Sequence, residues 1–407
     1  MISKTDYQHL SSIFNGPEGR YNYFPRITGW SGDLTSGQWF SNLEKHQEKN
    51  IDLYIHIPFC ERFCHFCGCN IKVAAKSDII ESYIQKVHEE WASYTRFGFR
   101  ISNLYLGGGT PNSLTPSQLT KLLSPFHGTF DIHTEYDPRH LSFDFLSILK
   151  ERGLRTISMG IQDFDEIVLA TIGRKTDFQV VEENLRFIKD LDLDKVNIDL
   201  IYALPKQGES SLKLLDNFLQ KDLVTGISLY PFAEVPWFKD FYPSWQKERI
   251  SLEQKSSLHY DFLETMTSNG FSPISFGHFA KKQDGTQYER TIMGFNQNCE
   301  SIVIALGVSA ISTTPEMIKQ NTKIFDHYLA KGDTSFSGHT RTNAQMLLEQ
   351  LLLDLSAQKK VDHSSFKIPQ NLIEQGLVRT HEEQIQLTDN GQYFCQYICA
   401  EIVKHNN

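Results

Sequence analysis

The sequence lacks any run of about 18 apolar residues, the length at which a segment becomes a candidate for a membrane-spanning helix. It also begins without the basic segment and apolar core of a secretory signal peptide. With 40 Lys and Arg against 49 Asp and Glu, the net charge of −9 gives no general attraction to nucleic acid or anionic lipid. We therefore expect a cytoplasmic protein without a membrane or nucleic-acid partner, in which a local basic pocket meets any anionic ligand.

The cysteines lack the second Cys/His pair that would close a zinc site. Instead, Cys60, Cys64 and Cys67 lie in a single loop with C-x3-C-x2-C spacing, directly after an apolar segment. Three thiolates in this spacing fit a 4Fe–4S cluster with one iron left open for a small molecule that offers amino and carboxylate groups. The loop therefore predicts an iron–sulfur site, and unpaired thiols agree with a reducing compartment.

The other cysteines allow several interpretations. Cys69 can act as a fourth ligand, as a thiol behind the ligands or as a helper in the chemistry, and the last two are favoured. Cys299 is isolated, whereas Cys395 and Cys399 lie four residues apart in a helix-like stretch, which predicts core packing. Buried thiols with accidental spacing are the alternative for the cysteine loop.

Short apolar runs alternate with amphipathic stretches between residues 50 and 235, which is the pattern of repeated βα units around a parallel sheet. We expect an α/β fold with a partial (β/α)6 barrel, whose reacting groups lie at the carboxyl ends of the strands. The predicted strands are Leu53–Ile57, Leu104–Leu106, Ile132–Tyr136, Thr156–Ile161, Val196–Ile201 and Ile227–Pro231.

Two predicted strands end in residues suited to ligand binding. The glycines of Leu106-Gly-Gly-Gly-Thr-Pro-Asn112 let backbone amides approach a ligand, although a triple glycine alone is as often a turn. Glu135 is placed to hold ribose hydroxyls by charge-assisted hydrogen bonds. The nearby Asp137 and Arg139 can pair with each other.

Together these segments resemble the oxygen-independent coproporphyrinogen III oxidases of the radical S-adenosylmethionine (SAM) superfamily. The resemblance covers most of residues 15 to 325. Its motifs are Tyr54-Ile-His-Ile-Pro-Phe59, Cys67-Gly-Cys69, Gly107-Gly-Gly-Thr-Pro111, Glu135-x-Asp-Pro-Arg139, Ser158-Met-Gly-Ile-Gln-Asp-Phe164, Asn197-Ile-Asp-Leu-Ile-Tyr202 and Leu204-Pro-Lys-Gln207.

The resemblance implies the oxidative decarboxylation of coproporphyrinogen III to protoporphyrinogen IX in heme biosynthesis, without dioxygen. It implies a 4Fe–4S cluster, held by Cys60, Cys64 and Cys67, that splits SAM into methionine and a 5′-deoxyadenosyl radical able to take hydrogen from a propionate. It also implies an electron donor such as flavodoxin or ferredoxin, and we expect a monomer. The residues implied to hold SAM are Gly108, Gly109, Thr110, Glu135, Gln162, Arg174 and Asp199.

A second SAM beside the first is also implied, near Tyr54, Ala233 and Ile311. Tyr54 and His56 alternate onto one face of a strand and are candidate catalytic residues, with core packing an equal alternative.

Three residues of the cysteine loop have further expected roles. Cys69 is a third candidate catalytic residue. Phe66 is expected to shield the cluster from water, and Gly68 to serve the loop backbone.

Several departures from the family pattern concern the substrate. Glu234 stands where the family commonly has His, which is electrostatically unfavourable near a tetracarboxylate. Ala203 replaces a usual Gly, and the final third is short and lacks an Arg-Arg-Asp pattern. Two alternatives therefore remain: a related radical SAM enzyme that performs C-methylation or modifies another tetrapyrrole, and a heme chaperone, although chaperones of this kind usually lack the Cys-Gly-Cys ending.

The C-terminal part looks like a winged-helix module. Residues 342–357 are helix-like, and residues 375–379 and 384–391 are predicted strands joined by a turn. Because Lys and Arg are not clustered there, a cap over the substrate pocket is favoured over DNA binding. The expected organisation is an N-terminal arm over the active site (1–49), the barrel with its extension (50–325) and the cap (326–407).

Overall fold

The computed structural model describes residues 2–14, 24–32, 34–140, 142–235, 250–281, 289–291, 294–296, 300–331 and 336–406. Cys299 and residues 15–23 of the expected N-terminal arm lie outside these ranges. Among the described residues, no helix combines the length and the apolar character needed to cross a bilayer.

A 12-stranded sheet organises the molecule. Its central strands run parallel and follow one another in sequence order. They are β1 (Asn50–Ile57), β4 (Arg100–Gly108), β5 (Asp131–Tyr136), β6 (Leu154–Gln162), β7 (Lys195–Tyr202) and β8 (Gly226–Pro231). Each of the six strands predicted from the sequence lies within one of these, so the predicted α/β fold is confirmed.

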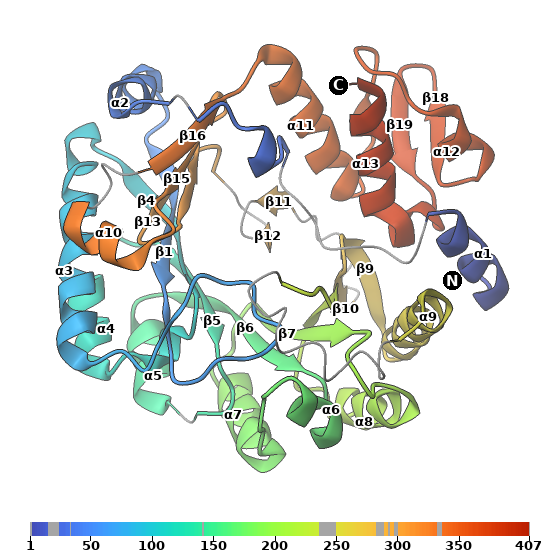
Figure 1. Ribbon diagram of the computed structural model, residues 1–407, viewed down its shortest axis with the longest axis horizontal. Helices are drawn as coiled ribbons and strands as arrows, with labels where there is room; N and C mark the ends of the chain where they lie inside the picture. The colour runs from blue at the N-terminus through green and yellow to red at the C-terminus, as the bar shows by residue number, and fades with distance from the viewer. Residues whose placement is uncertain are drawn as a thin grey trace.

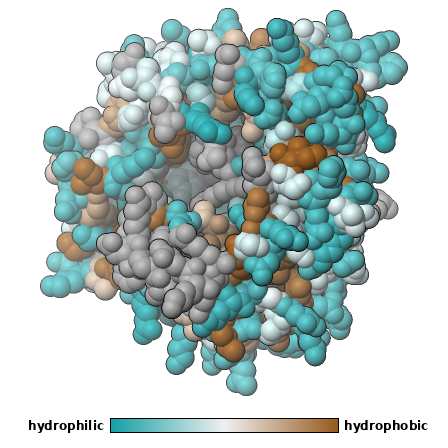
Figure 2. Space-filling model, turned by 45° about the vertical axis from the view of Figure 1, so that its right-hand side comes forward, coloured by the Kyte–Doolittle hydropathy of each residue, from teal (hydrophilic) through white to brown (hydrophobic). Residues whose placement is uncertain are grey.

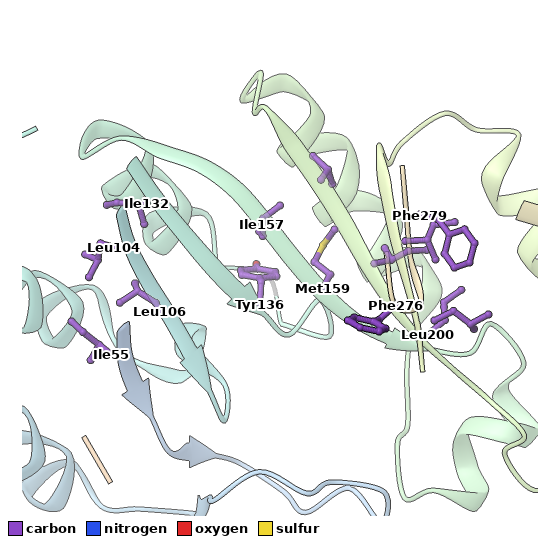
Figure 3. Packing of buried hydrophobic residues seen from close by; sticks show 14 of the residues in the cluster. Ile55, Leu104, Leu106, Ile132, Tyr136, Ile157, Met159, Leu200, Phe276 and Phe279 are labelled. Atoms are coloured by element: carbon purple, nitrogen blue, oxygen red, sulfur yellow. The ribbon is translucent and has the colours of Figure 1, made fainter. Parts of the chain in front are cut away.

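Helices connect these strands and cover the outer side of the curved sheet (Figure 1). Alternate apolar residues of the strands face them; Ile55, Leu104 and Ile132, for example, are fully buried in one continuous layer (Figure 3). The helices are α3 (Ser77–Ala92), α4 (Pro116–Leu123), α5 (Phe143–Glu151), α6 (Glu166–Thr171), α7 (Phe178–Asp190) and α8 (Glu209–Leu219).

The opposite face of the strands is polar. Asn103 on β4 donates from Nδ2 to Asp52 Oδ1 on β1 at 2.7 Å, and its Oδ1 lies 3.1 Å from His133 Nε2 on β5. On β6, Thr156 Oγ1 lies 2.7 Å from His133 Nδ1. A hydrogen-bonded row of polar side chains thus runs across the inner wall, which suits a barrel that receives a polar ligand.

Further strands extend the sheet beyond the six predicted ones. On the β1 side, β13 (Val303–Leu306) is parallel to β1, and three antiparallel strands follow it. These are β14 (Ile311–Thr313), β15 (Met317–Asn321) and β16 (Phe336–Thr340), and on the β8 side lie β10 (His278–Lys281) and β9 (Phe271–Ser275). Strand β16 belongs to the large sheet although it falls in the range expected for the cap.

The C-terminal module has its own three-stranded sheet beside three helices (Figure 1). Its first helix, α11 (Asn343–Ser356), begins after a capping box in which Thr342 Oγ1 accepts the Gln345 amide. The predicted helix and strands of this module are present. Its other elements are β17 (Val361–Asp362), α12 (Gln370–Glu374), β18 (Val378–His381), β19 (Gln384–Leu387) and α13 (Cys395–Asn406).

The N-terminal helix α1 (Lys4–Ile13) lies between α9 (Leu252–Ser268) and this module (Figure 1). The Tyr7 hydroxyl contacts His259 Nδ1 at 2.5 Å, and the Tyr7 ring stacks on Phe394. Cys395 and Cys399 of α13 are buried, as their spacing predicted. The remaining elements are α2 (Ser36–Lys45), β2 (Phe59–Cys60), β3 (Lys72–Val73), β11 (Glu289–Thr291), β12 (Gly294–Asn296) and α10 (Phe325–Lys331).

Candidate active site

The three-cysteine loop begins at the carboxyl end of β1 and closes on itself. Its short strands β2 and β3 pair, and the Ala74 amide donates to Cys60 O at 2.9 Å. Inside the loop the Cys67 amide donates to Cys64 O at 3.1 Å, which forms a turn. Cys64 is buried, whereas Cys60 and Cys67 are half-buried. The loop thus holds three thiols at the end of the barrel where ligands bind.

Burial raises the pKa of the Cys60 thiol to about 11, although the Thr110 hydroxyl, 3.4 Å from Sγ, acts in the opposite direction. The neighbouring Cys64 and Cys67 raise this pKa further, so the three thiols lie close enough to interact electrostatically. Without a bound cation the Cys60 thiol is therefore neutral at neutral pH. A metal centre is what favours its thiolate form.

Arg174, which follows α6, reaches the cysteine loop. Its Nη1 lies 3.8 Å from Cys64 Sγ, and its Nη2 donates to the carbonyl oxygen of Gly160 and lies 3.5 Å from Asp137 Oδ1. The Nε group is buried without a hydrogen-bond partner among the described residues. Since buried donors are normally satisfied, this group remains available to a bound ligand.

Asp137 lies between two guanidinium groups. Arg139 donates from Nε to both carboxylate oxygens at 2.9 and 3.0 Å, so the predicted pairing of these residues is confirmed. Burial alone would raise the pKa of Asp137, but Arg139 and Arg174 outweigh it and hold the pKa at about 2. The carboxylate is thus ionised and fixes the position of Arg174 near Cys64.

Tyr54 and His56 share the inner face of β1, as their alternation predicted. The Tyr54 hydroxyl lies 3.0 Å from His56 Nδ1, and His56 Nε2 lies 2.9 Å from Asn70 O. Because Asn70 O only accepts, Nε2 carries the proton and Nδ1 accepts from Tyr54. Burial lowers the pKa of His56, which keeps the ring neutral. His56 thereby ties β1 to the residue that follows Cys69.

The triple glycine packs directly against this histidine. Gly108 has φ +115°, and a Cβ at this position would lie 2.4 Å from His56 Cε1. A Cβ at Gly109 would lie 2.8 Å from the carbonyl oxygen of Phe59. The amide of Gly108 donates to Glu135 Oε2 at 2.8 Å. Glycine is therefore required here for close approach of the backbone, and the exposed Glu135 lies beside it.

The far side of the site is built by β6 and β7. A β-bulge between Gly160 and Gln162 interrupts the pairing of these strands, and Gln162 has φ +73° at the rim of the barrel. Asp199 on β7 accepts from Ser158 Oγ at 3.1 Å and from Asn197 Nδ2 at 3.0 Å. Burial raises the pKa of Asp199 against these hydrogen bonds.

The other predicted site residues lie in the cysteine loop, after β8 and at the start of β14. Phe66 packs on an apolar cluster that includes Leu169 and Ile172, whereas Gly68 and Cys69 are exposed. Ala233 follows β8 and is exposed, and Ile311 begins β14. These strands stand on opposite sides of β1 in the sheet order, so the second SAM site remains a prediction.

A model of the radical SAM superfamily matches residues 54–219. The match runs from β1 through the cysteine loop to the end of α8. Residues 54–219 thus form a radical SAM domain.

Curated relatives of this chain carry the name oxygen-independent coproporphyrinogen III oxidase. The relative from Escherichia coli (strain K12) is 26% identical over 95% of this chain and 92% of its own length. The Helicobacter pylori relative is 25% identical over 89% of this chain and 85% of its own length. The solved coproporphyrinogen III oxidase (HemN) from Escherichia coli, described as a radical SAM enzyme, matches with a TM-score of 0.85 at 26% identity, covering 95% of this chain and 98% of that chain.

A radical SAM domain uses a 4Fe–4S cluster and SAM, and the residues present fit both groups. Three interacting thiols lie beside the guanidinium groups of Arg139 and Arg174. Nowhere in the described ranges do three His, Cys, Asp or Glu side chains converge on a single-ion position. The Nε of Arg174, which has no hydrogen-bond partner among the described residues, is available as a donor to a bound anionic group.

Two supporting residues were not assigned a role from the sequence. Gln207 donates from Nε2 to Asp163 Oδ2 at 2.6 Å and to Ile201 O at 2.8 Å, so it joins the loops that follow β6 and β7. Glu90 on α3 is buried and accepts the Gly307 amide at 2.9 Å and the Tyr328 hydroxyl at 2.7 Å. The Leu204-Pro-Lys-Gln motif was a signal for Gln207, whereas Glu90 had none.

Proposed function

We propose that this protein is an oxygen-independent coproporphyrinogen III oxidase, which converts two propionate side chains of coproporphyrinogen III into vinyl groups and yields protoporphyrinogen IX. The observation that carries this proposal is the match over nearly the full length of both chains to enzymes of that name, in sequence and in structure. The motif residues support it, because they come together at the carboxyl ends of β1 and β4 to β7.

The chain's own residues would have separate roles in binding the cluster and SAM. Cys60, Cys64 and Cys67 bind the cluster, and the Arg174 guanidinium stabilises negative charge on Cys64 Sγ. Asp137 keeps Arg174 in place. The residues that would hold SAM are Gly108, Gly109, Thr110, Glu135, Gln162, Arg174 and Asp199.

A bound, reduced cluster would supply one-electron reduction of SAM, the chemistry from which hydrogen abstraction follows. Each reacting propionate loses one hydrogen atom, one carbon dioxide and one electron, and its two remaining carbons become the vinyl group. The electron passes to a one-electron acceptor. Tyr54 and His56 line the inner wall next to the glycines and orient the reacting groups there.

The departures from the family pattern are compatible with this reaction. Glu234 is exposed, so the acid that replaces a common His does not place a buried negative charge beside the substrate. Ala203 has φ +65°, a conformation in which glycine is favoured but alanine is tolerated at a cost of about 1 kcal/mol. Ala203 therefore changes stability more than chemistry.

We further propose the partners and the setting of the reaction. The electron donor is a small redox protein such as flavodoxin or ferredoxin, and the enzyme acts as a monomer in the cytoplasm. A second SAM binds near Tyr54, Ala233 and Ile311. Cys69, exposed beside the cluster ligands, assists the chemistry and does not ligate iron.

Anaerobic turnover tests the proposal. The protein is reconstituted with iron and sulfide, reduced, and supplied with SAM and coproporphyrinogen III. We expect protoporphyrinogen IX together with 5′-deoxyadenosine and carbon dioxide. Formation of 5′-deoxyadenosine without protoporphyrinogen IX would favour another radical SAM reaction, and heme binding without SAM cleavage would favour a chaperone.

A further inference from the structure

The inner wall of the barrel carries a lysine to which the proposed chemistry gives no role. Lys195 on β7 pairs in register with Thr156 of β6, one of the polar residues of that wall. It precedes Asn197 by two positions, and Asn197 donates to Ser158 Oγ at 2.8 Å on the same face. Since alternate residues of a strand share a face, Lys195 also points to the inside of the barrel.

The neighbouring strand leaves space for this side chain. Gly226 on β8 is the register partner of Asn197. A Cβ at Gly226 would lie 2.8 Å from Lys195 Cε and 2.8 Å from Asn197 Oδ1. A larger residue at position 226 would therefore displace Lys195, so glycine here allows the lysine to extend across the inner wall.

The ammonium group of Lys195 has no ion pair or hydrogen bond with any residue that the structure describes. Burial lowers its pKa, and only the charge of Asp199 acts in the other direction. Asp199 itself accepts hydrogen bonds from Ser158 and Asn197. A partly buried cation that contacts no anion is energetically unfavourable. An anionic group of a bound ligand would therefore stabilise it.

Two other cationic groups near the site have such partners. Arg139 and Arg174 share the carboxylate of Asp137. Burial lowers the pKa of His133 to about 4, so this inner-wall histidine is neutral at neutral pH. A substrate with several carboxylates that enters the barrel therefore meets, at Lys195, a basic group that forms no ion pair in the part of the chain that the structure describes. Figure 2 shows a recess in this face of the molecule, with hydrophilic residues among those at its edge.

We propose that Lys195 is a substrate-binding residue that pairs with a carboxylate of the tetrapyrrole inside the barrel. The assignment rests on the proposed function, because coproporphyrinogen III is a tetracarboxylate. It also bears on the departure at position 234, because Lys195 supplies a basic group elsewhere in the barrel, at the amino end of β7, whereas Glu234 follows the carboxyl end of β8. One carboxylate held at Lys195 helps to orient the ring so that a reacting propionate can lie at the opposite, carboxyl end of the strands.

Binding of coproporphyrin III, the oxidised ring with the same four carboxylates, tests this assignment without turnover. We would compare the wild type with Lys195→Met, which keeps the length of the side chain but removes its charge, and with Lys195→Arg. The control is Lys213→Met, on the exposed face of α8. Loss of one charge-assisted hydrogen bond predicts roughly tenfold weaker binding by Lys195→Met. Lys195→Arg and the control should keep most of the affinity.

The tetramethyl ester of coproporphyrin III separates charge recognition from general damage. Because the ester lacks carboxylates, the wild type and Lys195→Met should bind it equally. Equal loss of acid and ester binding, or unchanged acid binding in Lys195→Met, would overturn the assignment.

Turnover distinguishes a failure of this assignment from a failure of the proposed function. If the wild type makes protoporphyrinogen IX and Lys195→Met has the same KM, the Lys195 assignment alone fails. If the wild type makes none but binds coproporphyrin III in a Lys195-dependent manner, the assignment stands and the proposed reaction fails. A raised KM with little change in kcat is the expected result for a binding residue.

Discussion

The guanidinium Nη1 of Arg174 lies 3.8 Å from Cys64 Sγ, although 110 residues separate the two in the sequence. The contact connects the loop that would hold the cluster to the far wall of the barrel. Arg174 also contacts Gly160 O and the Asp137 carboxylate, so its position is determined from three directions. A planar, always charged group suits this place better than a flexible ammonium.

Arg174→Lys should retain iron but weaken SAM binding by about tenfold, because lysine keeps the charge and loses the planar set of donors. Iron content and equilibrium binding of SAM to the reconstituted protein measure the two effects. Arg186→Lys is the matched control, since Arg186 forms an exposed pair with Glu182 at 2.6 Å. Full SAM affinity in Arg174→Lys would remove Arg174 from the SAM site.

Cys64→Ser should abolish both cluster assembly and SAM cleavage, because a buried ligand of the cluster is lost. Cys69→Ser should keep the cluster's absorption spectrum, since Cys69 is exposed and is proposed not to ligate iron. Iron analysis and visible absorption after anaerobic reconstitution compare the two variants. A normal cluster in Cys64→Ser would contradict the ligand assignment.

Gly108→Ala should lower the free energy of unfolding by clearly more than Gly128→Ala. Both glycines have similar positive φ values, +115° and +111°, so alanine strains the backbone alike at about 1–2 kcal/mol. Only at Gly108 would the new Cβ collide with His56; at Gly128 no heavy atom lies within 4 Å. Urea unfolding measures the difference, and equal effects would show that the close approach to His56 is unimportant.

Asp52 should make stability fall as the pH rises. Burial raises its pKa to about 7, so between its ordinary pKa of 3.8 and that value the unfolded chain binds fewer protons than the native state. This loss amounts to at most about 4 kcal/mol by pH 7. Asp137 does not change this pH dependence. Its pKa is lowered, so its contribution to the free energy of unfolding is fully present at every pH above the ordinary pKa of an aspartate.

Asp52→Asn should therefore show a flatter pH dependence of stability between about pH 4 and about pH 7. Unfolding free energies from urea titrations at both ends of this range provide the measurement. Asp131→Asn is the control, because Asp131 is partly exposed and pairs with Arg155 at 3.0 Å. If the unfolding free energy of Asp52→Asn changes with pH as steeply as that of the wild type, the pKa of Asp52 is not raised in the folded protein.

The central strands could be predicted because each combines an apolar outer face with a polar or glycine-rich carboxyl end, a local pattern. The helix after Thr342 could be predicted almost to the residue, since Thr342 and Gln345 form a capping box. The strands β13 to β16 had no such signal. They are short, and β13 pairs with β1 although Val303 follows its partner Asp52 by 251 residues, a pairing that only the tertiary structure decides.

The cysteine site and the Asp137–Arg139 pair could likewise be predicted from local sequence. Contacts that link distant segments were not. Glu90 looks like one acid of an amphipathic helix, yet its partners Gly307 and Tyr328 lie 217 and 238 residues away. The unusual backbone of Ala203 also appears only in the structure, although the sequence marked the replaced glycine.

Transfer of hydrogen from the propionate to SAM-derived 5′-deoxyadenosine tests the central claim most directly. Coproporphyrinogen III deuterated at the propionate carbon next to the ring would be incubated anaerobically with the reduced, reconstituted protein and SAM. We expect one deuterium in 5′-deoxyadenosine and a vinyl group for each carbon dioxide released. Unlabelled 5′-deoxyadenosine with the propionates intact would contradict the account.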